Sequence, residues 1–279
     1  MRFLPTPDGL TLALHEHGGS GRPTLLCHAT GFHGAVWEPL SAALGDGFER
    51  WAVDFRAHGA STVPVDRELP WSEIATDVLT VIDALDPPPG QLLGVGHSMG
   101  GACLLLAEQA RPGTFAGLWL FEPIAPPPGA LAPAQGGNNL ADGALRRRSS
   151  FPSIADAVAN FAGKPPFHTL RADALHAYVR HGFVPGEDGA VHLACRPEQE
   201  SRVYRGGGAH DAFEHLGEVR CPVVVACGED LVGPAAFAPA IAAALPAGHL
   251  EPHRHMSHFG PLEAPTVLAE AIRAFAAGL

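Results

Sequence analysis

Residues 92–100, with the sequence Leu-Leu-Gly-Val-Gly-His-Ser-Met-Gly, join a short apolar run to a serine flanked by glycines. The apolar run is typical of a buried strand, and the apolar segment 102–110 that follows is typical of a helix. Ser98 would then occupy a sharp turn between strand and helix, where Gly96 and Gly100 leave room for neighbouring backbone. A G-x-S-x-G pattern in this context predicts a nucleophilic serine, with helix N–H groups facing any negative charge near its hydroxyl.

A base and an acid for this serine can be found downstream, in the chain order Ser, acid, His. His258 follows the last strand-like segment and precedes the last helical one, so it is the predicted base. Asp230 is the first candidate for the acid, because it comes just after a strand-like apolar run.

Short apolar runs alternate with segments of helical periodicity along most of the chain. Helical spacing is clear in 74–85 and 267–275, and an alternating N-terminal segment predicts a hairpin. The strand-like runs are 24–27, 51–53, 91–95, 118–121 and 223–227. This order predicts an α/β protein with a mostly parallel sheet covered by helices on both faces.

One long interval interrupts the alternation. Residues 123–220 contain no convincing buried strand, but they contain three stretches of helical periodicity, near 154–161, 172–179 and 198–204. A structureless loop of this length would be unusual. We therefore predict a core formed by 1–122 and 221–279, with 123–220 inserted as a helical cap.

The composition restricts the possible partners and location. The net charge of −11, from 18 Lys+Arg and 29 Asp+Glu, disfavours binding to nucleic acid or to anionic membranes. The three arginines at 146–148 are interpreted as a solvated helix end. No apolar run reaches the roughly 18 residues of a membrane span. The scattered cysteines and the absence of a signal-peptide pattern predict a cytoplasmic protein, either a monomer or a homo-oligomer.

Together, the motifs resemble the α/β-hydrolase-fold family of serine hydrolases that carry a cap domain. Besides 96–100, the resemblance rests on 28–32, similar to the HG oxyanion motif, on 54–61, similar to D-x-R-G-x-G-x-S, and on 258–265, similar to G-H-x-x-x-x-E-x-P. It covers nearly the whole chain. It implies an α/β-hydrolase fold with an eight-stranded, mostly parallel sheet.

The resemblance also implies roles for individual residues. Ser98 attacks an acyl carbonyl, and the backbone N–H groups of Thr30 and Met99 form the oxyanion hole. Ala29 departs from the family pattern, since glycine is usual there. The family's acid usually stands where this chain has Leu231, one residue after Asp230 and two after Glu229. In some members of the family the acid instead ends the sixth strand, where this chain has Glu122. The resemblance therefore leaves Glu122 and Glu229 open as alternatives to Asp230.

Aromatic residues near these motifs favour an apolar acyl or aromatic small molecule as substrate. Phe32 and Trp37, near the oxyanion motif, and His97, beside the serine, are the predicted substrate contacts. Four phenylalanines of the cap either line the same pocket or form the cap's own core: Phe151, Phe161, Phe167 and Phe183.

The predicted activity is hydrolysis of a small-molecule carboxylic ester, lactone or thioester through an acyl-enzyme on Ser98. No cofactor is required, and the histidines at 253, 255 and 258 lack the further ligands that a metal site needs. Two other functions stay open. One is a C–C bond hydrolase that cleaves a vinylogous diketone with the same triad, and the other is a non-catalytic ligand-binding member of the fold.

Overall fold

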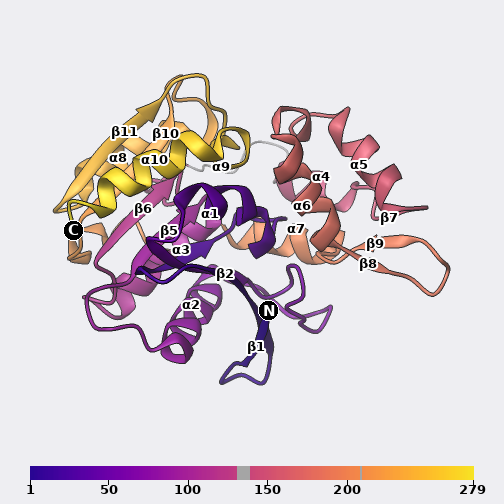
Figure 1. The fold of residues 1–279 in the computed structure, drawn as a ribbon, viewed down its shortest axis with the longest axis horizontal. Coiled ribbons are helices and arrows are strands. Elements are labelled where there is room, and N and C mark those ends of the chain that lie inside the picture. The colour runs from indigo at the N-terminus through magenta and orange to yellow at the C-terminus, as the bar shows by residue number, and fades with distance from the viewer. Residues whose placement is uncertain (131–138, 208) are drawn as a thin grey trace.

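The structure, a computed structural model, describes residues 1–130, 139–207 and 209–279 and contains a large sheet covered by helices (Figure 1). Its strands are β1 (Arg2–Pro5), β2 (Thr11–Gly18), β3 (Arg22–Cys27), β4 (Phe48–Asp54), β5 (Leu93–His97), β6 (Gly117–Phe121), β10 (Val223–Gly228) and β11 (Gly248–His253). The order in the sheet is β1-β2-β4-β3-β5-β6-β10-β11. The pairs β1–β2 and β2–β4 are antiparallel, and all other neighbours are parallel. The predicted hairpin and mostly parallel eight-stranded sheet are confirmed.

Both faces of the sheet are buried, because alternate strand residues enter two separate hydrophobic clusters. On β6, for example, Leu118 and Leu120 face one cluster, while Trp119 and Phe121 face the other. The first cluster is covered by α2 (Trp71–Leu85), α3 (Met99–Ala110) and α8 (Ala238–Ala244), and the second by α1 (Glu38–Leu44) and α10 (Pro265–Ala276). None of the helices in the described ranges has the length and apolar character needed to cross a membrane.

The segment between β6 and β10, called the insertion below, forms a group of short elements beside the core (Figure 1). It contains α4 (Asn139–Leu145), β7 (Ser150–Phe151), α5 (Ile154–Ala162), α6 (Ala172–Gly182), β8 (Phe183–Pro185), β9 (Val191–Leu193) and α7 (Pro197–Gly206). The three predicted helical stretches correspond to α5, α6 and α7. The small sheet β7-β9-β8 was not predicted, since strands of two or three residues are too short to establish a period of two.

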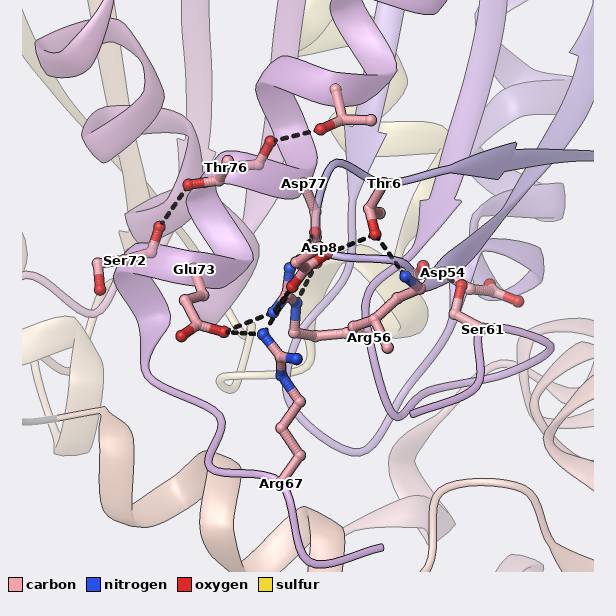
Figure 2. Close-up of polar contacts among 12 residues, drawn as sticks. Thr6, Asp8, Asp54, Arg56, Ser61, Arg67, Ser72, Glu73, Thr76 and Asp77 are labelled. Atoms are coloured by element: carbon pink, nitrogen blue, oxygen red, sulfur yellow. Dashed lines mark hydrogen bonds and ion pairs between the residues drawn. The ribbon is translucent and has the colours of Figure 1, made fainter. Parts of the chain in front are cut away.

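A network of ion pairs holds the loop after β4 against α2 (Figure 2). Arg56 binds both carboxylate oxygens of Asp77, at 2.6 and 2.7 Å, and the carboxylate of Glu73 at 2.6 Å. At the start of this loop, the Asp54 carboxylate accepts the N–H of Gly34 at 2.6 Å. The loop is therefore tied both to α2 and to the segment that follows the 28–32 motif.

Arg56→Met is expected to lower the free energy of unfolding by about 3–5 kcal/mol, because it leaves the Asp77 carboxylate buried without its cation. The side chains of Arg56 and Asp77 are only 3% and 1% exposed. The matched control is Arg111→Met, which breaks an ion pair with Asp83 whose side chains are 43% and 65% exposed, and should cost less than about 1 kcal/mol. Urea unfolding measures both, and equal losses would contradict this assignment.

Candidate active site

The turn between β5 and α3 holds Ser98 in a strained backbone conformation. Its φ of 56° and ψ of −115° lie in a region that side-chain-bearing residues rarely adopt, at a cost of roughly 1–3 kcal/mol. The flanking positions must be glycine because neighbouring backbone lies too close to them to leave room for a side chain. A Cβ on Gly96 would lie 2.7 Å from Gly101, and one on Gly100 would overlap the carbonyl oxygen of Cys27. The turn therefore has the geometry expected of a nucleophile elbow.

A buried carboxylate binds the predicted base. Glu122, directly after β6, accepts a hydrogen bond from Nδ1 of His258 at 2.6 Å through its Oε2. Its Oε1 accepts the backbone N–H of Gly228 at 2.9 Å, so both carboxylate oxygens are held in place. The Glu122 side chain is only 2% exposed. With Nδ1 donating to this carboxylate, Nε2 of His258 is left as the nitrogen that can accept a proton.

The expectation that Asp230 would pair with His258 is not met in the structure. Asp230 lies on the exposed turn after β10 and has no contact with His258 within the described residues. Glu229 is also turned away, with its carboxylate toward the backbone N–H of His255 at 3.3 Å and toward Arg254 at 3.9 Å. The reason is topological: β6 lies between β5 and β10 in the sheet, so a residue at its end reaches the histidine from the strand next to the serine.

The loop that carries His258 is fixed on both sides. Glu263 accepts the N–H of Ser257 at 2.9 Å and its hydroxyl at 2.6 Å, which explains the spacing of His and Glu in the 258–265 motif. On the other side, Nε2 of His97 donates to the carbonyl oxygen of His258 at 2.7 Å. Burial lowers the pKa of His97 well below its usual range, so this donor is a neutral imidazole. His97, predicted as a substrate contact, here supports the histidine loop.

The two predicted oxyanion residues lie side by side. The Thr30 hydroxyl donates to the Met99 sulfur at 3.3 Å, and no acceptor is found among the described residues for either backbone N–H. The left-handed residue of the Thr30 loop is Gly31, with φ of 79°, so a glycine is not needed at position 29. The N–H of Gly31 donates to Nε2 of the buried His58 at 3.0 Å, which anchors the loop to the core.

Aromatic side chains surround the His258 and Thr30 loops. The Phe32 ring lies 5.9 Å from Phe259 and 6.0 and 5.2 Å from two rings of the insertion, Phe167 and Tyr178. Phe32 is itself buried among these rings, and its contact with substrate stays a prediction. Trp37 is fully buried in a hydrophobic cluster of the core, and its position does not support the predicted substrate contact. The rings of Phe151, Phe161 and Phe183 pack on one another, as expected for a core of the insertion.

The interpretation of the arginines at 146–148 as a solvated helix end is wrong for one of them. Arg146 and Arg148 are exposed, but the side chain of Arg147 is only 19% exposed. It forms an ion pair with Glu200 and donates to the Tyr178 hydroxyl at 2.5 Å. These partners lie on distant parts of the chain, and no local sequence pattern connects them to Arg147.

Several buried histidines make the stability of the protein depend on pH. Burial lowers the pKa of His33 and of His58 to about 4. In the unfolded chain these imidazoles bind protons more readily than in the folded protein. The stabilisation that comes from keeping them neutral is therefore fully present above about pH 6.5, and it is lost as the pH falls toward 4. At pH 5 each is expected to have lowered the free energy of unfolding by about 2 kcal/mol relative to pH 7.5.

Urea unfolding at pH 7.5 and pH 5 measures this loss. The variant His58→Gln removes one of these histidines, so its stability should change less with pH than that of the native chain. Stability that stays constant between the two pH values, or an unchanged pH dependence in the variant, would contradict the prediction.

Comparison with known proteins identifies the family of this chain. A family model described as the alpha/beta hydrolase family matches residues 24–271. A 2-(acetamidomethylene)succinate hydrolase from Mesorhizobium japonicum is 30% identical over 238 residues, covering 82% of this chain and 78% of that protein. A crystal structure of E-2-(acetamidomethylene)succinate hydrolase superposes with a TM-score of 0.80 at 25% identity, covering 98% of this chain and 97% of the other. A Thermogutta terrifontis esterase shares the fold, with a TM-score of 0.73 at 20% identity over 99% and 98% of the two chains. The chain belongs to the alpha/beta hydrolase family.

Proposed function

We propose that this protein is a serine hydrolase that cleaves a small-molecule carboxylic ester, lactone or thioester through an acyl-enzyme on Ser98. The observation that carries the proposal is the 2.6 Å hydrogen bond between Glu122 and His258. It forms beside the strained turn of Ser98, whose backbone N–H donates at 3.0 Å to the carbonyl oxygen of Phe121, the residue before Glu122. A buried acid, a histidine and a serine on a sharp turn at one edge of the sheet are the parts that acyl transfer requires.

In the proposed reaction, Nε2 of His258 takes the proton of the Ser98 hydroxyl as the oxygen attacks the substrate carbonyl. Glu122 keeps the imidazole in the tautomer with Nδ1 protonated and stabilises the imidazolium that forms. The N–H groups of Thr30 and Met99 donate to the negative oxygen of the tetrahedral intermediate. His258 then protonates the leaving group, and a water molecule, activated by the same imidazole, releases the acid and restores Ser98.

A second candidate is hydrolysis of an amide. The relative that is 30% identical over most of this chain is named for a substrate with an acetamido group. The same arrangement of Ser98, His258 and Glu122 serves ester and amide cleavage alike, because both pass through a tetrahedral intermediate at an acyl carbon. The leaving group distinguishes the two: an amine nitrogen needs the proton from His258 more than an alkoxide does.

The test is a substrate panel with the products identified by mass spectrometry. It contains short-chain and aryl esters, a lactone, a thioester, 2-(acetamidomethylene)succinate and a vinylogous diketone, each incubated with the native chain and with Ser98→Ala. Release of a carboxylic acid and an alcohol by the native chain alone is the expected result. Carbon–carbon cleavage of the diketone would replace the proposal with the C–C hydrolase alternative. Thermal stabilisation by a panel compound without turnover would favour a ligand-binding protein.

A further inference from the structure

A buried polar cluster joins three parts of the insertion. Arg147, just after α4, forms an ion pair with Glu200 of α7 and donates to the hydroxyl of Tyr178 of α6. The guanidinium also lies 6.0 Å from the ring centres of Phe161 and Phe167. We call Arg147, Tyr178 and Glu200 the arginine cluster.

The arginine cluster rests on the Thr30 loop. A Cβ added to Gly31 would overlap Oε1 of Glu200, so this carboxylate packs directly against the backbone next to Thr30. Tyr178 contacts the following residues: its ring lies 5.2 Å from that of Phe32, and its carbonyl oxygen accepts a hydrogen bond from Nε2 of His33 at 3.0 Å. Three consecutive residues after Thr30 thus contact the cluster.

The opposite side of the same loop is held by the core. Nε2 of His58 accepts the N–H of Gly31 at 3.0 Å, while Glu200 approaches Gly31 from the insertion. Gly31 is in the left-handed region, with φ of 79°, where its backbone has no side chain to restrict it. Contacts on both sides therefore restrain a glycine that would otherwise give the neighbouring Thr30 N–H freedom to turn.

The charge balance of the cluster favours a positioning role over a site for an anion. The Arg147 cation already has the Glu200 carboxylate as its counter-ion, and both side chains are largely buried. An anionic substrate group would have to approach a guanidinium that is already neutralised. It would also lie close to the Glu200 carboxylate, which would repel it. Removing either partner, by contrast, leaves a buried charge without compensation and lets the contact with Gly31 relax.

We propose that Arg147, Tyr178 and Glu200 are positioning residues that hold the backbone N–H of Thr30 in place for the oxyanion. The inference rests on the proposed function, in which Thr30 supplies that donor. The insertion then contributes to the chemical step itself, through the contact of Glu200 with Gly31 of the core. Loss of a whole oxyanion donor costs about 10²–10³-fold in kcat, so a displaced donor is expected to cost about 10–100-fold.

The experiment compares Glu200→Gln and Tyr178→Phe with the native chain and with the control Arg148→Gln, which changes the exposed neighbour of Arg147. Glu200→Gln keeps the shape of the side chain and removes its charge, and Tyr178→Phe keeps the ring and removes only the hydroxyl. The measurements are kcat and KM for a neutral ester and for its carboxylate-bearing analogue, the affinity for a boronic acid that forms a tetrahedral adduct on serine, and the rate of fluorophosphonate labelling at Ser98.

The expected result for Glu200→Gln is a kcat about 10–100-fold lower for both esters, with KM changed by less than about threefold. Boronic acid affinity should fall by a similar factor, and labelling at Ser98 should slow, whereas the control stays at the native values. Tyr178→Phe should change the same quantities in the same direction by a smaller factor. If Glu200→Gln does not fold, Tyr178→Phe alone tests the positioning role.

Three results would overturn the inference. Native labelling rates and kcat in both folded variants would make the cluster merely structural. A KM that rises only for the carboxylate-bearing ester would make it an anion site. A kcat loss without weaker boronic acid binding would show that the cluster does not act through the oxyanion donor. Failure of the proposed function is distinguishable from all three, because it would appear as absence of labelling at Ser98 in the native chain.

Discussion

Replacing Ser98 with alanine is expected to lower the rate of hydrolysis by about 10⁴-fold or more while the protein stays folded. The hydroxyl is the proposed nucleophile, and neither His258 nor the oxyanion donors can replace the bond that it forms with the acyl carbon. The measurement is kcat on the best substrate of the panel. Because alanine keeps the Cβ, the backbone at this position should stay in its present conformation with φ of 56°.

The urea unfolding midpoint provides the control for Ser98→Ala. Its value should stay close to the native one, because the change removes a single oxygen atom from the side chain. A variant that keeps more than about a tenth of the native activity would show that another group attacks the substrate. If the variant loses its folded structure, unfolding alone explains the loss of activity. Ser98→Cys would then replace Ser98→Ala as the test variant.

Glu122→Gln is expected to lower kcat by about 10⁴-fold, since an amide can present its NH₂ group to Nδ1 of His258 and favour the wrong imidazole tautomer. The 2.6 Å contact with His258 and the hydrogen bond from the Gly228 N–H identify Glu122 as the group that orients the base. Measured kcat, with KM changed little, is the expected signature of a group whose effect is largest in the transition state.

Asp230→Asn is the matched control for Glu122→Gln, because it makes the same chemical change at the exposed candidate acid. It should leave kcat within about twofold of the native value. The opposite ranking, with Asp230→Asn severely impaired and Glu122→Gln active, would move the orienting acid to the turn after β10 and would require a conformation different from this structure.

The sequence predicted the core of the fold well because its signals are local. Apolar runs such as 223–227 mark strands buried on both faces, and the glycines around Ser98 mark a turn that only they allow. The short spacing between His258 and Glu263 likewise reflects a local contact, because Glu263 binds Ser257, the residue before His258. Each of these inferences needed a segment of about ten residues.

The acid and the arginine cluster could not be predicted in the same way, because they depend on distant segments. Glu122 and Asp230 both follow strand ends, and only the position of β6 between β5 and β10 distinguishes them. Arg147 is one of three consecutive arginines, and its burial is decided by Tyr178 and Glu200. Pairings of this kind are set by packing of the insertion on the core, which local periodicity does not encode.

Labelling with a fluorophosphonate, followed by intact-mass measurement and peptide mapping, tests most directly whether Ser98 is an activated nucleophile. The reagent requires a serine with a working base and oxyanion hole, and it requires no knowledge of the substrate. One adduct per native chain, located on the peptide that contains Ser98 and absent from Ser98→Ala, is the predicted result. Folded native protein that acquires no adduct, or acquires it on another residue, would contradict the proposed serine hydrolase.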